Sequence, residues 1–256
     1  MSFEEYYRNN VTYISTLDPR LRAIIDVVGR LAPSSLLDVG CGRGFLLDRL
    51  DERGVRGLVG VDVFSDVSSS RWSYLEGDVT VRLPVPDASF DAVVAGEIIE
   101  HVPNPDRLLR EVRRVLVPGG ALVVSTPNLV SWANRVLVPL GIQPLATETS
   151  SEVALGRRLR VLGQGNQVQG HLKVFTHRAL QEILERYGFR VLERHGVPAF
   201  FPPPFDRVDR LFTRSVALSS GLLFVARSPV GGWPDPPQGR RHDALGVDED
   251  RGGRPA

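Results

Sequence analysis

The stretch Leu36-Leu-Asp-Val-Gly-Cys-Gly-Arg-Gly44 decides how this chain folds. It predicts a short buried strand that runs into three glycines at alternate positions, Gly40, Gly42 and Gly44. Glycines let a ligand approach the backbone closely, and the N–H groups at the start of the helix predicted to follow suit a carboxylate or a phosphate. Taken alone, the stretch fits either a plain strand–turn–helix or a site for a nucleotide-like ligand.

Apolar strands and amphipathic helices alternate along the chain after this turn. Strands that are apolar throughout and separated by helices predict a parallel sheet covered on both faces, with ligands at the carboxyl ends of the strands. We therefore expect an α/β fold built on a doubly wound, mostly parallel sheet of seven strands. The predicted strands are residues 35–39, 57–63, 72–76, 90–95, 121–125, 189–194 and 221–226, and the predicted helices are 45–53, 105–116, 176–187 and 206–218.

Changes in sequence character divide the chain into regions. Residues 1–30 are predicted to form an N-terminal helical segment, with Pro19 in the first turn of a helix. Residues 31–228 are predicted to form the main domain. Within it, residues 128–170 are expected to be an inserted lid, because about forty residues of weak regularity are long for a loop of a compact domain. Residues 229–256 are rich in proline, glycine and charge and are expected to be a disordered tail.

The composition narrows the classes of partner. The chain is 42% hydrophobic and 24% charged, with a formal net charge of +1, so it offers no overall attraction for nucleic acid. We expect no membrane span, because no run of about 18 apolar residues occurs. The start of the sequence lacks the features of a signal peptide. Cys41 is the only cysteine, which we interpret as a small buried residue, and a cytoplasmic location is expected.

Acidic residues end the next two predicted strands. Asp62 lies about 20 residues after the glycines, where a carboxylate can accept hydrogen bonds from both hydroxyls of a ribose. Asp78 can accept a hydrogen bond from the exocyclic amine of adenine, and the N–H of Val79 can meet a ring nitrogen. The dinucleotide-binding pattern Gly-x-Gly-x-x-Gly needs a glycine where this chain has Phe45, which disfavours a nicotinamide-dependent enzyme.

Together these motifs resemble the class I S-adenosylmethionine-dependent methyltransferases. The resemblance rests on the glycine stretch, on the two acids, and on Phe90-Asp91, Glu97-Ile-Ile-Glu-His101 and Pro118-Gly-Gly120, the last of which is also predicted to end a helix. It implies S-adenosylmethionine as the cofactor and a Rossmann-like sheet whose final strand is antiparallel.

The resemblance also implies which residues bind the cofactor. Asp38, Gly40 and Gly42 would hold its methionine end; the alternative for Asp38 is that it only caps the adjoining turn. Glu97 would begin the segment that lines the pocket for methyl transfer. The full set of expected cofactor-binding residues is Asp38, Gly40, Cys41, Gly42, Gly44, Asp62, Val63, Asp78, Val79, Gly96 and Glu97.

His101 and Glu97 are the candidate catalytic residues. The methyl group of a sulfonium is already activated, so the enzyme has to align the acceptor and exclude water. A hydroxyl or ammonium acceptor also needs a base, for which His101 is the best candidate. The alternative is that His101 hydrogen-bonds the loop at residues 103–105.

A metal site is a further hypothesis at the same place. Glu97, Glu100 and His101 would share one face of a helix, and two carboxylates with an imidazole suit a divalent cation such as Mg²⁺ or Zn²⁺. Ubiquinone-pathway O-methyltransferases and small-RNA 2′-O-methyltransferases are relatives that use this motif for metal, and His171 would complete the site. In other relatives the same motif supports the cofactor pocket without metal, and both interpretations stay open.

The second half of the chain bears on the acceptor. The order Ser125-Thr-Pro-Asn128, an insertion, then Gly170-His-Leu-Lys-Val-Phe-Thr176 is similar to small-molecule and glycan-pathway O-methyltransferases. It favours transfer to a hydroxyl of a small-molecule or carrier-linked acceptor, such as a glycan, a quinone or a natural product. The alternatives are an RNA 2′-O-methyltransferase, which the near-neutral charge disfavours, and a non-catalytic S-adenosylmethionine-binding protein.

Overall fold

The computed structural model describes residues 17–156, 168–199 and 201–231. The predicted segment before residue 17 and most of the predicted tail therefore lie outside the described residues. No helix in the described ranges has both the length and the apolar character needed to cross a bilayer. The elements in chain order are α2 (Pro19–Leu31), β1 (Leu36–Val39), α3 (Phe45–Glu52), β2 (Leu58–Asp62), β3 (Ser73–Glu76), β4 (Phe90–Gly96), α4 (Pro105–Val115), β5 (Leu116–Pro127), α5 (Trp132–Leu137), the 3₁₀ helix η1 (Val138–Leu140), α6 (His177–Arg186), β6 (Arg190–Val197), α7 (Phe205–Phe212) and β7 (Gly221–Arg227).

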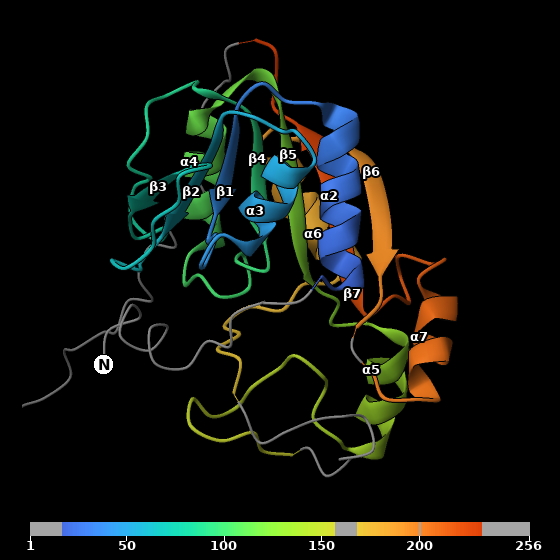
Figure 1. Cartoon of the computed structure of the whole chain (residues 1–256). Helices are drawn as coiled ribbons and strands as arrows, with labels where there is room; N and C mark the ends of the chain where they lie inside the picture. The colour runs from blue at the N-terminus through green and yellow to red at the C-terminus, as the bar shows by residue number, and fades with distance from the viewer. Residues whose placement is uncertain (1–16, 157–167, 200, 232–256) are drawn as a thin grey trace, which may run out of the picture.

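The described strands form one seven-stranded sheet in the order β3-β2-β1-β4-β5-β7-β6 (Figure 1). The first five strands pair in parallel, and β7 pairs antiparallel with both β5 and β6. This confirms the doubly wound, mostly parallel sheet with an antiparallel final strand. The strand order reverses between β1 and β4, which is where such a sheet opens a crevice for a ligand.

Helices cover both faces of the sheet (Figure 1). Neighbouring residues of a strand point to opposite faces, so Leu36 packs under α2 and α3 whereas Leu37 packs under α4 and α6. Both leucines are fully buried, and each such side chain contributes about 1.5–3 kcal/mol of burial free energy. The strands are apolar throughout because both of their faces are covered, as the sequence pattern predicts.

Polar side chains fix where the helices begin. Asp18 accepts a hydrogen bond from the N–H of Leu21 (2.7 Å) and so caps α2, with Pro19 as its first residue. Asn104 caps α4 in the same way, and Thr176 caps α6. These caps satisfy N–H groups that have no partner inside the helix, and the α2 and α6 starts agree with the sequence prediction.

Two elements differ most from their predicted bounds. The fifth strand was expected at residues 121–125, but β5 already begins at Leu116 and includes Pro118-Gly-Gly120. Residues 117–120 lie opposite Asp91 alone, because a bulge interrupts the pairing with β4 and Gly119 has a φ of +78° that favours glycine. Helix α7 ends at Phe212, earlier than the predicted residue 218.

The inserted segment packs against α7 beyond the carboxyl ends of the parallel strands (Figure 1). The buried carboxylate of Asp209 in α7 accepts hydrogen bonds from Trp132 Nε1 (2.7 Å), from the N–H of Ala199 (2.7 Å) and from the hydroxyl of Ser220. The Trp132 ring also stacks on Phe212, with 5.5 Å between ring centroids. One buried carboxylate therefore joins the insertion to the β6–β7 connection.

Candidate functional site

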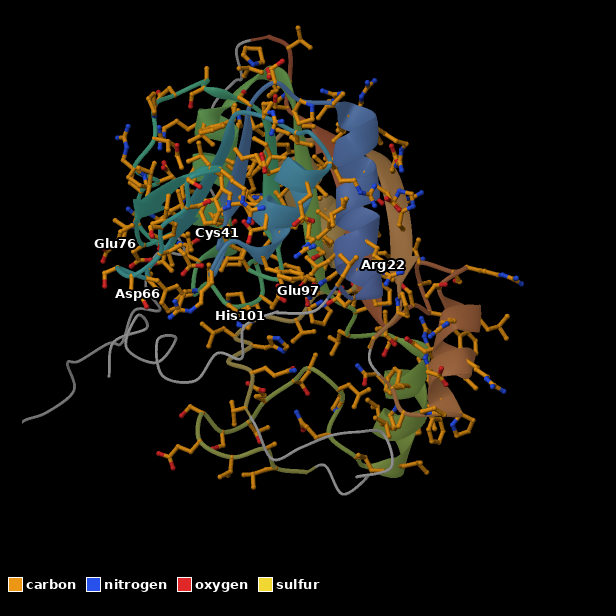
Figure 2. All side chains as sticks on the ribbon, in the orientation of Figure 1. Arg22, Cys41, Asp66, Glu76, Glu97 and His101 are labelled. Atoms are coloured by element: carbon orange, nitrogen blue, oxygen red, sulfur yellow. The ribbon has the colours of Figure 1, made fainter. Side chains whose placement is uncertain are left out.

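The predicted cofactor residues come together at the carboxyl ends of the parallel strands. Asp38 lies near the end of β1, Asp62 is the last residue of β2 and Gly96 the last residue of β4. Figure 2 shows Glu97 and His101 at this same end of the sheet. The topology thus gathers side chains that are far apart in sequence, as expected for a doubly wound fold.

The glycine turn after β1 has a backbone that other residues adopt poorly. Gly40, Gly42 and Gly44 have φ values of +76°, +55° and +78°. A Cβ at Gly44 would lie 2.0 Å from the Trp72 ring, and a Cβ at Gly40 would lie 2.9 Å from Ile98. Glycine is therefore required here both by the left-handed backbone and by close packing.

Asp62 ties the glycine turn to β2. Its carboxylate accepts hydrogen bonds from the N–H of Gly42 and from its own neighbour Val63, each at 2.7 Å. Burial raises the pKa of Asp62, and these two hydrogen bonds lower it. The carboxylate predicted to meet a ribose thus also fixes the turn that would surround the cofactor.

Asp38 and Cys41 are both buried beside Asp62. Burial raises the pKa of Asp38 to about 7, and the negative charge of Asp62 adds to this effect. Burial also raises the pKa of the Cys41 thiol, so the thiolate is disfavoured. A Cβ at Gly60 would lie 2.6 Å from the Cys41 sulfur, so this cysteine fills space against β2.

Asp78 and Val79 follow β3, as predicted. The Asp78 carboxylate accepts a hydrogen bond from the N–H of Thr80 (2.7 Å), and Val79 is buried. Asp78 therefore stabilises the turn at the position where the sequence predicts recognition of adenine.

Residues 97–101 form a turn, so the predicted helix at this place is wrong. Glu97 has a φ of +54°, in the left-handed region, and thus leaves β4 without starting a helix. Its Oε1 accepts a hydrogen bond from the Ser125 hydroxyl (3.0 Å), and its Oε2 pairs with Arg20 Nη1 (2.9 Å). Tertiary contacts on both carboxylate oxygens hold this backbone conformation.

Arg20 is a neighbour of the candidate site that the sequence analysis missed. It lies in the first turn of α2, and its side chain is only 16% exposed. One guanidinium nitrogen contacts Glu97 and another contacts Asp18 (3.1 Å), whereas the buried Nε has no hydrogen-bond partner in the described part of the chain. Nothing in the sequence spacing signals this contact, because α2 reaches the end of β4 only in the folded sheet.

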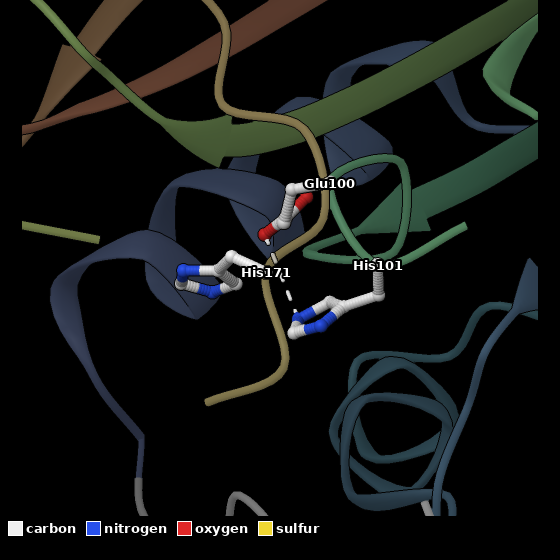
Figure 3. A group of neighbouring side chains, drawn as sticks. All are labelled: Glu100, His101 and His171. Carbon is white, nitrogen blue, oxygen red and sulfur yellow. Dashed lines mark ion pairs between the residues drawn. The ribbon is translucent and has the colours of Figure 1, made fainter. Parts of the chain in front are cut away.

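Glu100, His101 and His171 form a compact group (Figure 3). One ligand atom from each side chain lies within 4.8 Å of the others, and the two imidazole centroids are 4.7 Å apart. Glu100 is fully buried; its Oε2 accepts a hydrogen bond from the Thr126 hydroxyl (2.9 Å). Its Oε1 has no hydrogen-bond partner within the described residues and lies 3.9 Å from His101 Nε2.

Backbone carbonyls set the tautomers of the two histidines. His101 Nδ1 lies 3.2 Å from the carbonyl oxygen of Gly170, and His171 Nδ1 lies 2.8 Å from that of Ala146. A carbonyl only accepts, so both Nδ1 atoms donate, and in the neutral rings both Nε2 atoms carry a lone pair. The carbonyl of Gly170 is thus the partner of His101 Nδ1, and the alternative of a hydrogen bond from His101 to the loop at residues 103–105 stays a prediction.

Burial controls the charge of this group. It lowers the pKa of His101 to about 3, with a further contribution from His171. It also raises the pKa of Glu100 well above its usual range, and the negative charge of Glu97 adds to this. The structure thus brings together three of the four predicted metal ligands, whereas Glu97 lies outside the group because Arg20 and Ser125 engage its carboxylate.

Comparisons with known proteins bear on this site. A family described as "Methyltransferase domain" matches residues 13–194. A probable S-adenosylmethionine-dependent methyltransferase of Mycolicibacterium smegmatis is 32% identical over 182 residues, which is 69% of each chain.

Two further relatives match more narrowly. The ubiquinone biosynthesis O-methyltransferase of Xanthomonas oryzae pv. oryzae is 37% identical over 108 residues, but the match spans only 38% of this chain and 45% of that relative. The solved structure of Burkholderia thailandensis 1,6-didemethyltoxoflavin-N1-methyltransferase, with S-adenosylhomocysteine bound, gives a TM-score of 0.53 at 19% identity. It covers 83% of this chain and 79% of that chain, and this likeness concerns the fold.

Proposed function

Because the chain belongs to the class I S-adenosylmethionine-dependent methyltransferases, we propose that it methylates a hydroxyl group of a small-molecule or carrier-linked acceptor. The observation that carries this proposal is the pair of adjacent imidazoles at His101 and His171, whose Nε2 atoms carry lone pairs, in one group with the buried Glu100. A hydroxyl, unlike a thioether or a neutral amine, must lose a proton on methylation and therefore needs a nearby base that accepts this proton. The partial match to an O-methyltransferase of ubiquinone biosynthesis supports the same assignment.

The residues present fit S-adenosylmethionine. The buried carboxyl of Asp38 suits the cofactor's ammonium group, because a cation would stabilise the ionised form that burial disfavours. Asp62 is assigned to the ribose, and Asp78 with Val79 to the adenine. We add Arg20 to the methionine end, since its buried Nε has no acceptor among the described residues and a guanidinium binds carboxylates well. The cofactor supplies an activated methyl group.

In the proposed reaction, the protein aligns the acceptor, excludes water and receives a proton. The methyl group needs no further activation, so alignment of the acceptor oxygen is the main task. Without a bound cation, His101 would accept the proton at Nε2, because its Nδ1 donates to Gly170. A base with a pKa of about 3 stays neutral near pH 7 but is weak. The acceptor hydroxyl must therefore be acidic by itself or be activated in another way.

We propose that a divalent cation held by Glu100, His101 and His171 would provide that activation by lowering the pKa of the acceptor hydroxyl. The Nε2 of His101 would then hold the cation, so the hydroxyl proton would pass to solvent and not to His101. The fit is supported by the buried Oε1 of Glu100, which has no other partner in the described part of the chain. It is also supported by the two Nδ1–H groups that donate to backbone carbonyls, as metal-bound histidines commonly do. Two imidazoles with one carboxylate favour a metal such as Zn²⁺ or Mn²⁺ over Mg²⁺.

Methyl transfer from labelled S-adenosylmethionine to a panel of acceptors tests the proposal. The panel holds phenols, sugars and carrier-linked hydroxyl compounds, with amines and short RNA as the alternatives. We expect label only on hydroxyls of the small or carrier-linked compounds. Transfer confined to RNA or to amines would contradict the acceptor assignment. Loss of activity with a chelator, restored by Zn²⁺ or Mn²⁺, is expected if the cation is required, and full activity without metal would exclude it.

A histidine variant tests the role of His101. His101→Gln should lower kcat at least 100-fold, because general-base catalysis contributes about 10²–10⁴, while S-adenosylhomocysteine affinity stays unchanged. His195→Gln is the matched control, since His195 is half exposed on β6 and contacts Glu193. Equal activity of the two variants would refute the assignment.

A further inference from the structure

The carboxylate of Glu148, in the insertion, binds three consecutive backbone N–H groups. Its Oε1 accepts from Gln169, and its Oε2 accepts from Gly170 (2.8 Å) and His171 (3.2 Å). Gly170 has a φ of +79°, which helps successive N–H groups converge on one anion. Hydrogen bonds to an ionised carboxylate are about twice as strong as neutral ones, so Glu148 is a firm anchor for this segment.

The same segment is bound on its other side by the turn after β4. The carbonyl of Gly170 receives the hydrogen bond from His101 Nδ1, and the N–H groups of Leu172 and Lys173 donate to the carbonyl of Glu100 (2.8 and 3.0 Å). Residues 169–173 thus form a bridge, with Glu148 on one side and the Glu100–His101 turn on the other. His171, in the middle of the bridge, faces His101 (Figure 3).

The insertion holds the side chain of His171 as well as its backbone. The carbonyl of Ala146, two residues before Glu148, accepts the hydrogen bond from His171 Nδ1 (2.8 Å). One short stretch of the insertion therefore fixes both the position and the tautomer of this imidazole.

We propose that Glu148 is a positioning residue that assembles the Glu100, His101 and His171 group from the insertion side. It acts through the backbone of residues 169–173 and does not itself contact the acceptor. Without the Glu148 carboxylate, three N–H groups lose their acceptor, the bridge loosens, and His171 no longer stays beside His101. This inference rests on the function proposed above for the three side chains.

Hydrogen exchange measured by mass spectrometry tests the bridge without any acceptor. In Glu148→Ala, the amides of Leu172 and Lys173, which bind Glu100 rather than Glu148, should exchange on the order of 10-fold faster than in the wild type. Glu148→Gln keeps one carbonyl oxygen as an acceptor and should give an intermediate rate. Glu152→Ala is the matched control, because Glu152 is exposed in the same stretch, and it should leave the rates unchanged.

Faster exchange confined to residues 169–171 would overturn the proposal, because Glu148 would then stabilise only its own local turn. A melting temperature close to that of the wild type shows that each variant is folded. If Glu148→Ala does not fold, the comparison of Glu148→Gln with Glu152→Ala decides in the same way.

Two further measurements separate positioning from stability. Once an acceptor that the wild-type enzyme methylates is known, Glu148→Ala should lower kcat on this acceptor about 10–100-fold, as is typical for residues that orient metal ligands. The affinity of the variant for S-adenosylhomocysteine should be unchanged. Its affinity for Zn²⁺ alone should fall by a similar factor, and unchanged kcat and Zn²⁺ affinity would overturn the proposal. Absence of transfer by the wild type to any acceptor would instead refute the proposed function, while the exchange rates still decide the role of Glu148.

Discussion

At the scale of single residues, Asp62 combines a structural role with a proposed role in binding the cofactor. Its carboxylate holds the N–H groups of Gly42 and Val63. Asp62→Ala should weaken binding of S-adenosylhomocysteine by about 2–3 kcal/mol, because the carboxylate would no longer accept hydrogen bonds from the two ribose hydroxyls. Calorimetry measures this directly. Asp66→Ala, at an exposed carboxylate that pairs with Arg43, should bind normally. An unchanged affinity in Asp62→Ala would rule out the ribose assignment.

Asp38 predicts a pH dependence of stability in the cofactor-free protein. Its folded pKa, about 7, is raised above the usual value of 3.8, so the folded state holds a proton more tightly than the unfolded state. The resulting stabilisation is fully present below about pH 4 and disappears as the pH rises through 7, with a magnitude on the order of 4 kcal/mol. Asp38→Asn should therefore melt at a higher temperature than the wild type at pH 8, and this gain should shrink towards pH 4. A gain independent of pH would disprove this account.

At the scale of elements, the turn into α3 depends on the Gly44–Trp72 contact. Gly44→Ala should destabilise the protein through its positive φ (about 1–2 kcal/mol) and through a clash with Trp72 (about 1–3 kcal/mol more). Gly54→Ala is the matched control, because Gly54 has a similar φ of +82° but nothing within 4 Å of the added Cβ. Urea unfolding should show a larger loss for Gly44→Ala, and equal losses would mean that Trp72 simply moves away.

The elements also show what sequence could and could not predict. All seven described strands were predicted, because their apolar runs follow from burial on both faces, although β5 begins earlier than expected. The helix starts at Pro19 and Thr176 follow from local capping. The spacing of Glu97, Glu100 and His101 failed to predict a turn, because that spacing describes a shared face only if a helix forms. Contacts with distant Arg20 and Ser125 set the backbone of Glu97, and no local pattern carries this information.

The grouping of Glu100, His101 and His171 was expected from motif resemblance. Its anchor at Glu148 was not, because the three N–H groups of residues 169–171 meet this carboxylate only after the insertion folds back. The sequence thus identified the candidate reactive side chains, and the structure was needed to find Glu148, which positions them.

At the scale of the whole molecule, Asp209 joins three separate segments. Its fully buried carboxylate accepts hydrogen bonds from Trp132, Ala199 and Ser220. Asp209→Ala should lower the free energy of unfolding by about 3 kcal/mol, because three donors lose a buried, charged acceptor. In chemical denaturation, Arg210→Ala is the control and should change stability by less than about 0.5 kcal/mol, since Arg210 is exposed. A small effect of Asp209→Ala would show that the segments do not depend on this carboxylate.

The antiparallel β7 has a consequence for how the molecule is made. It lies between β5 and β6 yet comes after both of them in the sequence. During synthesis, β5 and β6 are therefore both complete on the ribosome while the strand that pairs with each of them is still missing. Unpaired strand edges invite association with other chains. The interval before residues 221–227 emerge is thus the stage at which a nascent chain most needs protection by chaperones.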